Sequence, residues 1–405
     1  MKILFITDNF PPEVNAPATR TFEHCREWLK QGAEVTVITC APNFPYGKTY
    51  RGYANRLYQK ESVDGIAVVR VWSYMSSNSG FVRRILDYMS FALSAFIAGL
   101  FQRSDIIIAT SPQFFTTWSA AALSVVKRRP WIFELRDIWP ESICSVGAMD
   151  RGMIFNALEK IELALYRHSD KVIAVTDAFK TNLILRGIPG SQIEVVTNGS
   201  NRDLFSPRPK DEKLLASLHL SDKFIVGYIG THGLAHSLEF IVNAMAKVDD
   251  VDIHFLFIGD GAMKRKIMAL AEELKLVNVT FLDSVAKEEV PRYLASVDLL
   301  LVPLKKEANF RTVIPSKIFE ASAMHRPILL GVEGQAQEII EQYGAGLCFE
   351  PENEEDFLAK VKQLKDDGVL YAQCQSECER LATDYDRKRI ADMMYQIIMD
   401  VVDKK

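Results

Sequence analysis

Short runs of β-branched and other apolar residues alternate with longer helical patterns along the whole sequence. The runs predicted as strands are 3–7, 35–39, 67–71, 106–110, 131–135, 172–175, 194–197, 225–229, 253–258, 279–282, 299–302, 328–330 and 346–349. Most are continuously apolar, which is typical of parallel strands covered on both faces. Helices between them fit right-handed crossovers, so we predict an α/β chain with doubly wound parallel sheets.

The alternation breaks once, at residues 198–210, where turn residues and two prolines favour a linker. At roughly 150 residues per domain, 405 residues also favour two to three domains. We therefore predict Rossmann-like domains at 1–200 and 201–385, and a helix at 386–405 that packs back on the first domain. Ligands of open α/β sheets sit beyond the carboxyl ends of the strands, so we expect the site in a cleft between the domains.

Charge and cysteine content limit the function and the compartment. Lys+Arg is 48 and Asp+Glu is 52, and a net charge of −4 disfavours general nucleic-acid binding. The six cysteines form no CxxC pair, which suits a reducing compartment. The first apolar run is too short for a signal peptide, and no run is long enough to span a bilayer. We therefore expect a cytoplasmic protein.

The loop after the first predicted strand contains polar residues that are candidates for ligand contacts, namely Glu13, Asn15 and Arg20. A strand followed by a loop and a helix start can present backbone N–H groups to an anion or a sugar. The loop contains no glycine, so a dinucleotide GxGxxG motif is absent. An alternative is a plain connection that Pro11 and Pro12 make rigid.

A second charged loop follows the buried run 131–135. Asp137 and Glu141 are candidates to accept a proton from an acceptor hydroxyl, an effect typically worth about 10²–10⁴-fold in rate. The alternative is an ion pair between Arg136 and a carboxylate that only shapes the loop.

The second half opens with a loop that suits a diphosphate. Gly230 and Gly233 allow a ligand to approach the backbone closely. Thr231, His232 and His236 are the polar candidates there, although a histidine at a helix start is more often a surface residue. The later Gly259-Asp260-Gly261 is better explained as a tight turn.

The most informative stretch lies after run 299–302. Pro315 and Ser316 favour a helix start, which places Lys317 and Glu320 on one helix face. A carboxylate can accept hydrogen bonds from a ribose diol, and a lysine complements phosphate charge. The alternative is a surface Lys–Glu pair.

Metal binding has little support in the sequence. Asp384-Tyr385-Asp386 and Asp250-Val251-Asp252 are DxD triplets, but one adjoins a basic run and the other precedes a strand. Cys374 and Cys378 have no nearby histidine, and no HExxH cluster occurs. We therefore expect neither a metal nor another cofactor.

Several motifs together resemble one enzyme family. They are PPE at 11–13, ATR at 18–20, LRDIWPE at 135–141, VTNG at 196–199, GTHG at 230–233 and IPSKIFE at 314–320, with Asp298, Pro303, Arg326 and Pro327. The chain resembles retaining glycosyltransferases of family four with the GT-B fold. Within that family it is similar to bacterial O-antigen and capsule enzymes that include N-acetyl-L-fucosaminyl transferases.

The resemblance implies a UDP-sugar donor bound mainly by the second domain. Glu320 matches the second glutamate of the family's E-x7-E pattern, which binds the donor ribose, and the first falls at Thr312. Lys317 and Arg311 are the cations available for the diphosphate. The acceptor hydroxyl would enter on the side of the leaving group, and we assign its orientation to Asp137. No histidine general base is assigned.

The implied acceptor is a saccharide linked to polyprenyl diphosphate at the inner face of the cell membrane. The apolar segments 81–86 and 91–101, with Arg103 and the basic residues 127–129, would suit an anionic leaflet. A buried helix is the alternative for these segments. A non-hydrolysing UDP-sugar epimerase of the same fold is the alternative function, and a dehydrogenase or a two-lobed sugar-binding protein fits less well.

Overall fold

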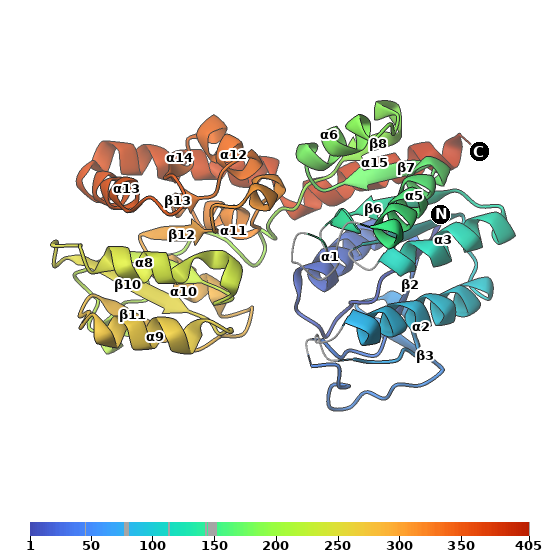
Figure 1. The fold of residues 1–405 in the computed structure, drawn as a ribbon, viewed down its shortest axis with the longest axis horizontal. Helices are drawn as coiled ribbons and strands as arrows, with labels where there is room; N and C mark the ends of the chain where they lie inside the picture. The colour runs from blue at the N-terminus through green and yellow to red at the C-terminus, as the bar shows by residue number, and fades with distance from the viewer. Residues whose placement is uncertain (45, 77–80, 112–113, 142–143, 145–151, 405) are drawn as a thin grey trace. The chain divides into compact units, whose positions relative to one another are not determined.

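The structure of the protein is a computed structural model that describes residues 1–44, 46–76, 81–111, 114–141, 144 and 152–404, without the side chains of 81, 82 and 309. The described chain divides into two compact units, Met1–Thr197 with Lys388–Lys405 and Asn198–Arg387 (Figure 1). The domain limits predicted from the sequence, 200 and 385, compare with 197 and 387 in this division. The cleft between the domains stays a prediction.

Unit 1 is built on an eight-stranded sheet with the order β3-β4-β2-β1-β5-β6-β7-β8. Its strands are β1 (Lys2–Ile6), β2 (Glu34–Cys40), β3 (Tyr58–Val63), β4 (Ile66–Val71), β5 (Ile106–Thr110), β6 (Trp131–Leu135), β7 (Lys171–Ala174) and β8 (Ile193–Val195). All neighbouring pairs are parallel except β3 with β4. The parallel strands match the predicted runs because continuous apolar segments are buried on both faces.

Strand β3 was not predicted. Its residues, Tyr58–Val63, are mostly polar, and their exposure alternates along the strand. Such a segment becomes a strand through pairing with its antiparallel neighbour β4, with Tyr58 opposite Val71. Edge strands of this kind carry little hydrophobic signal of their own.

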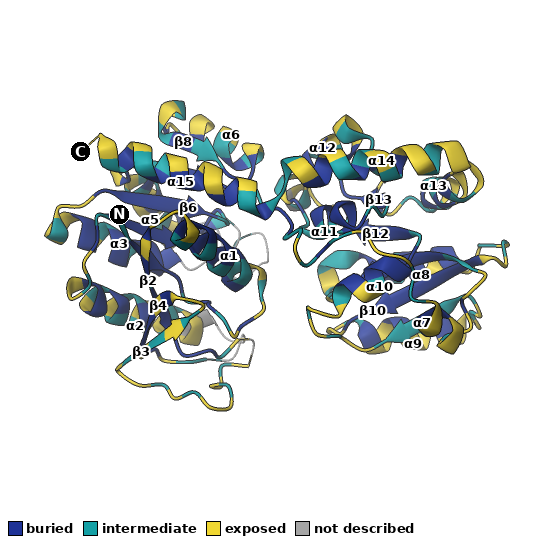
Figure 2. Ribbon diagram, turned by 180° about the vertical axis from the view of Figure 1, so that it is seen from behind, coloured by how far each residue is buried: buried dark blue, intermediate teal, exposed yellow. Residues whose placement is uncertain are grey.

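Helices cover both faces of this sheet (Figures 1 and 2). Those of unit 1 are α1 (Ala16–Lys30), α2 (Phe81–Leu100), α3 (Phe114–Lys127), α5 (Met153–His168), α6 (Asp177–Leu185) and α15 (Arg387–Asp403). Helix α15 lies on α1, where Trp28 Nε1 donates a hydrogen bond to the Ala391 carbonyl (2.9 Å). Unit 1 thus contains the beginning and the end of the chain.

Unit 2 contains a six-stranded parallel sheet with the order β11-β10-β9-β12-β13-β14. Its strands are β9 (Phe224–Ile229), β10 (Ile253–Ile258), β11 (Val279–Leu282), β12 (Leu299–Pro303), β13 (Ile328–Gly331) and β14 (Gly346–Cys348). Its helices are α7 (Glu212–Ser217), α8 (Leu238–Met245), α9 (Lys264–Glu273), α10 (Val290–Ser296), α11 (Lys317–Ala323), α12 (Gln335–Tyr343), α13 (Glu354–Asp366) and α14 (Gly368–Asp384).

The strand orders confirm the predicted doubly wound α/β class and locate the functional edge of each sheet. The order reverses between β1 and β5 in unit 1 and between β9 and β12 in unit 2. Loops that leave the carboxyl ends of strands at such a reversal form the usual ligand crevice of open α/β sheets. No helix among the described residues is long and apolar enough to cross a membrane.

Candidate active site

The candidate site in unit 2 lies where the loops after β9 and β12 meet. The first of these loops begins at Gly230, whose φ of 137° favours glycine. A Cβ atom at this position would lie 2.6 Å from Lys317 Nζ, the ammonium group at the start of α11. The predicted glycine and the predicted lysine are therefore in direct proximity, and a side chain at Gly230 would displace the lysine.

An aromatic ring lies against the ammonium group of Lys317. Its Nζ lies 4.2 Å from the centre of the Tyr228 ring, a cation–π arrangement. Burial lowers the pKa of Lys317 from 10.5 to about 8, although the Glu320 carboxylate one turn away acts in the opposite direction. Within the described part of the chain, no carboxylate lies within 4.0 Å of this ammonium. A partly buried cation without a close counter-ion is costly to desolvate, which makes Lys317 a candidate binding point for an anion.

Two histidines stand beside this lysine. The His232 side chain is fully buried, and neither ring nitrogen has a hydrogen-bond partner among the described residues. His236 is half-buried, and its Nδ1 likewise has no partner in the described structure. Burial, followed by the positive charge of Lys264 for His232 and of Lys317 for His236, lowers both pKa values to about 4. Both rings are therefore neutral at pH 7.

The glycines of the neighbouring loop hold His232 in this position. Gly259 has a φ of 149°, and a Cβ there would lie 1.9 Å from the Gly230 carbonyl oxygen and 3.3 Å from His232 Nε2. Gly261, with a φ of 155°, also lies close to the His232 backbone. The turn predicted at 259–261 thus also packs against the loop after β9.

The remaining predicted donor residues have different surroundings. Arg311 is exposed, and its Nε and Nη2 donate to Glu333 Oε2 at 2.9 and 2.6 Å. Thr231 is exposed, and its carbonyl accepts a hydrogen bond from Tyr228 (2.6 Å). Gly233 precedes the short 3₁₀ turn of Leu234–His236. The ligand roles predicted for these residues stay predictions.

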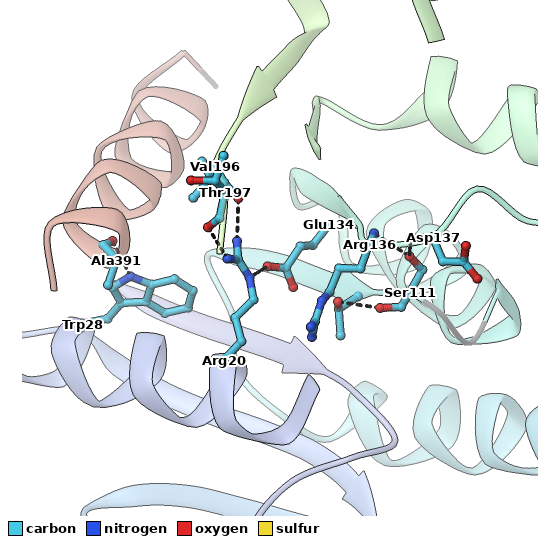
Figure 3. A network of polar contacts seen from close by, with 10 residues as sticks. Arg20, Trp28, Ser111, Glu134, Arg136, Asp137, Val196, Thr197 and Ala391 are labelled. Atoms are coloured by element: carbon cyan, nitrogen blue, oxygen red, sulfur yellow. Dashed lines mark hydrogen bonds and ion pairs between the residues drawn. The ribbon is translucent and has the colours of Figure 1, made fainter. Parts of the chain in front are cut away.

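In unit 1, the predicted Arg20 forms a buried internal network (Figure 3). Its Nε donates to Glu134 Oε1 (2.8 Å), and its other two nitrogens donate to the carbonyls of Thr197 (2.6 Å) and Val196 (2.9 Å). Both side chains of the pair are 1% exposed. Burial alone would raise the pKa of Glu134, but Arg20 and Arg136 hold it below the usual value. Arg20 therefore joins α1 to β6 and to the end of β8.

The loop after β6 is anchored by its backbone. The backbone N–H groups of Arg136 and Asp137 donate to Ser111 Oγ at 2.8 and 3.2 Å. The Asp137 carboxylate points away from the Arg20–Glu134 pair in Figure 3. Asp137 and Glu141 are both half-buried and contact other groups of the chain. Their catalytic roles stay predictions.

Glu13 and Asn15 have clear structural roles in the loop after β1. The buried Glu13 accepts hydrogen bonds from the backbone N–H groups of Asn43 (2.8 Å) and Phe44 (2.9 Å). Asn15 caps α1, because its Oδ1 accepts from the Ala18 N–H (2.9 Å). The helix begins at Ala16, directly after this cap. Their contacts with a ligand stay predictions.

The structure adds residues that the sequence analysis did not select. Tyr228 supplies the ring beside Lys317, and its place at the carboxyl end of β9 was the available signal. Asp8 lies two residues after the end of β1, and burial raises its pKa to about 7. Burial likewise raises the pKa of Asp87 to about 6. Asp8 thus stands at the strand reversal of unit 1 as a further titratable group.

The weak metal motifs take part in structural contacts. Asp250 pairs with Lys365, and Asp384 Oδ2 accepts from Tyr343 Oη (2.7 Å). Cys374 and Cys378 are both buried in the core. Among the residues that the structure describes, no group of three or more potential metal ligands comes together.

Family comparisons account for both units. Residues 15–199 match the glycosyl transferase 4-like domain, and residues 223–367 match the glycosyl transferases group 1 family. The two matches together cover most of the chain. The chain is a glycosyltransferase of the GT-B fold. The alternative of a UDP-sugar epimerase gains no support from these comparisons.

Curated relatives of this glycosyltransferase carry related names. The putative colanic acid biosynthesis glycosyl transferase WcaI of Escherichia coli is 26% identical over 377 residues, covering 90% of this chain and 92% of the relative. The probable glycosyltransferase WbjE of Pseudomonas aeruginosa is 22% identical, covering 64% of this chain and 66% of the relative.

Solved structures support the same fold. Sucrose-phosphate synthase from Thermosynechococcus elongatus aligns with a TM-score of 0.79 at 16% identity, and the alignment covers all of both chains. HepE from Anabaena, in complex with UDP and glucose, aligns with a TM-score of 0.73 at 18% identity over 99% of this chain and all of HepE. The predicted GT-B fold is therefore confirmed.

Proposed function

We propose that this glycosyltransferase moves a sugar from a UDP-sugar to a saccharide linked to polyprenyl diphosphate, with retention of the anomeric configuration. N-acetyl-L-fucosamine is the candidate sugar, and assembly of O-antigen or capsule polysaccharide is the proposed process. The observation that carries the proposal is the partly buried Lys317 ammonium, which lies beside Gly230 without a close carboxylate partner among the described residues.

The donor diphosphate is assigned to Lys317. A diphosphate oxygen beside this ammonium would supply a counter-charge, and charge-assisted hydrogen bonds of this kind are the stronger ones. His232 and His236 offer ring nitrogens beside the same position that bond to no other described residue. Glu320, on the same helix face as Lys317, is the proposed acceptor for the ribose hydroxyls.

The comparisons favour these substrates without testing them. HepE has been crystallised with UDP-glucose as well as with UDP. WcaI carries the name of colanic acid biosynthesis, and TuaH of Bacillus subtilis carries that of teichuronic acid biosynthesis. Both names refer to glycosyltransferases of a biosynthetic process, which agrees with the proposed role in polysaccharide assembly.

The proposed reaction exchanges one bond at the anomeric carbon for another. The bond from this carbon to the diphosphate oxygen breaks, and the acceptor oxygen bonds to the carbon on the same face. The hydroxyl proton passes to the leaving diphosphate. Lys317 stabilises the negative charge that builds on that group, a type of contact worth about 10²–10³ in rate. Asp137 orients the acceptor hydroxyl, and Glu141 is the second carboxylate of that loop.

The proposed reaction uses no metal ion, because the protein's own donors would carry the diphosphate charge. A lipid-linked acceptor is found at a membrane surface, so we assign the enzyme to the cytoplasmic side, peripheral on the inner face of the cell membrane. Arg311 is a secondary candidate for the donor, because it would first have to leave Glu333.

A thermal-shift titration with UDP and UDP-sugars tests the donor site, since a ligand selective for the folded state raises its stability. We expect UDP to stabilise the wild type and Lys306→Met, and to stabilise Lys317→Met little or not at all. Lys306 is a suitable control because it also follows β12 but is exposed and paired with Glu350. Equal UDP shifts in all three proteins would contradict the proposed site.

A turnover assay tests the transfer itself. With a UDP-sugar and a lipid-linked acceptor, we expect a product whose anomeric configuration, read by NMR, equals that of the donor. Asp137→Asn should bind UDP normally and lose about 10²-fold or more in turnover. Conversion of a UDP-sugar to its epimer without any acceptor would instead support the epimerase.

A further inference from the structure

One face of helix α2 is apolar and exposed along its length. The residues on this face recur every three or four positions, so they form one stripe on the helix. They are Leu86, Met89, Leu93, Ile97 and Leu100, each of which is between 38% and 62% exposed. A soluble monomer rarely leaves such a contiguous apolar surface without a partner.

The opposite face of α2 holds the helix on unit 1. Phe91, Ala95 and Ala98 are buried in the core beside β2 and β4. Gly99 lies so close to α3 that a Cβ there would come within 2.4 Å of the Leu123 side chain. The orientation of α2 is therefore fixed by packing, and the exposed stripe is a property of the folded unit (Figure 2).

The apolar surface continues past the end of α2. Phe101 is 79% exposed, and Val125 and Val126 near the end of α3 are 61% and 60% exposed. Lys127 Nζ fastens these helix ends together, since it donates to the carbonyls of Leu100 (3.2 Å) and Gln102 (2.7 Å). We call the stripe together with Phe101, Val125 and Val126 the α2 surface.

Positive charge flanks the α2 surface at both ends. Arg83 and Arg84 are exposed at the start of α2, and the basic residues 103, 128 and 129 lie at the other end. The sequence of α2 and α3 contains one carboxylate, Asp87, which accepts from the Ser76 N–H at 3.1 Å. An apolar stripe between clusters of arginine complements an anionic lipid surface, where acyl chains lie beneath negative headgroups.

We propose that the α2 surface docks unit 1 on an anionic bilayer, with α2 lying in the interfacial plane. A second copy of this chain fits less well, because a two-fold contact along α2 would bring arginine clusters of the same sign together. A transmembrane role does not fit, because α2 is not apolar enough to cross a bilayer. The role of this docking, which is to reach a lipid-linked acceptor, rests on the proposed function. The docking itself rests on the α2 surface alone.

Co-sedimentation with vesicles tests the docking. The full chain at micromolar concentration would be mixed with vesicles of phosphatidylglycerol and phosphatidylethanolamine, and separately with phosphatidylcholine vesicles. We expect binding to the anionic vesicles to be at least about tenfold tighter, and to weaken as salt rises. Leu93→Glu with Ile97→Glu should lower that binding about tenfold or more, because it places two carboxylates in the stripe.

A matched control uses another exposed apolar pair in unit 1. Ile184 and Leu185 of α6 are 45% and 83% exposed. Ile184→Glu with Leu185→Glu adds the same charge away from the α2 surface, so its vesicle binding should stay within about twofold of the wild type. Circular dichroism and the thermal shift with UDP verify that both double variants are folded.

Three results would overturn the docking proposal. They are no sedimentation with anionic vesicles, equal losses in the two double variants, and a dimer in solution that Leu93→Glu with Ile97→Glu dissociates. A different result would contradict the proposed function, namely equal thermal shifts with UDP in the wild type and in Lys317→Met. Vesicle binding by the Lys317→Met variant should remain unchanged.

Discussion

The two units treat a cation at the edge of a sheet in opposite ways. In unit 1, Arg20 places its guanidinium against Glu134 and two backbone carbonyls, and both side chains of the ion pair are buried. In unit 2, Lys317 ends beside an aromatic ring with no described carboxylate close by, and neutral histidines stand next to it. Sequence position alone made both residues candidates for ligand contacts. The difference teaches that a charged residue at a strand end becomes a candidate for ligand binding only where the fold leaves its charge without a close partner.

The largest expected effect on stability comes from breaking the ion pair between Arg20 and Glu134 in unit 1. Arg20→Met should lower the free energy of unfolding by about 3–5 kcal/mol, because it removes the cation that bonds directly to the buried Glu134 carboxylate. Urea denaturation of the full chain, followed by circular dichroism, measures this change. The double variant Arg20→Met with Glu134→Leu should recover most of the loss. If both proteins were equally destabilised, packing rather than charge would explain the effect.

The corresponding change in unit 2 should affect function rather than stability. Lys317→Met removes an uncompensated cation, so the free energy of unfolding without ligand should stay the same or rise. Turnover with a saturating UDP-sugar should fall by about 10²–10³, or about 2.7–4 kcal/mol of transition-state stabilisation. Steady-state kinetics and urea denaturation of the same preparation separate the two effects. A large loss of stability with normal turnover would reverse the comparison.

The pH dependence sharpens the same contrast. The pKa of Lys317 is about 8 in the fold and 10.5 as the ordinary value. In the proposed function the ammonium form binds the diphosphate, so the dissociation constant for UDP should rise above pH 8, by up to about tenfold per pH unit. The unfolded chain holds this proton between pH 8 and 10.5 and the folded chain does not, so the contribution of Lys317 to unliganded stability rises with pH there.

Calorimetric titration at about pH 7, 8, 9 and 9.5 measures the change in the dissociation constant for UDP, because these pH values bracket the lowered pKa of Lys317. Thermal unfolding without UDP over the same range measures the change in unliganded stability. Lys317→Met should abolish both trends. Any change with pH that remains in this variant comes from other groups. A dissociation constant that does not change across this range would show that Lys317 is not the titrating group.

The smallest effect is expected at the exposed pair of unit 2. Arg311→Met breaks the contact with Glu333, and pairs of this kind contribute about 0.2–1 kcal/mol to the free energy of unfolding. Urea denaturation should therefore place this variant within about 1 kcal/mol of the wild type. A UDP affinity reduced more than about tenfold would instead show that Arg311 leaves Glu333 to contact the donor.

Much of the fold was predictable because its strands are buried on both faces. A short, continuously apolar run such as Ile253–Ile258 is typical of a strand inside a parallel sheet, and the structure has a strand with the same bounds. Strand β3 was missed because its stability comes from pairing with β4 and not from its own polar residues. The apolar run in α2 was predicted to face either a membrane or the protein core. The structure has a buried face that includes Phe91 and an exposed face that includes Leu93. The sequence offered these two surroundings as alternatives, because which residues face the core depends on the tertiary structure.

The candidate site was predictable as a set of positions and not as a set of contacts. Gly230 and Lys317 were selected because each follows a buried strand, and the structure brings them together. The pairing of Arg311 with Glu333 depends on how α12 approaches the loop after β12, which no local pattern reveals. Tyr228 was missed because an aromatic residue at the end of a buried strand is ordinarily counted as core. Its position beside Lys317 becomes visible only when the two loops are assembled.

The place of helix α15 has a consequence for how the chain is made. Synthesis proceeds from the N-terminus, and domains generally fold as units as they emerge from the ribosome. The indole N–H of Trp28 nevertheless bonds to the carbonyl of Ala391, which lies 363 positions later in the chain. The first unit therefore remains without its last helix until the whole of the second unit has been translated.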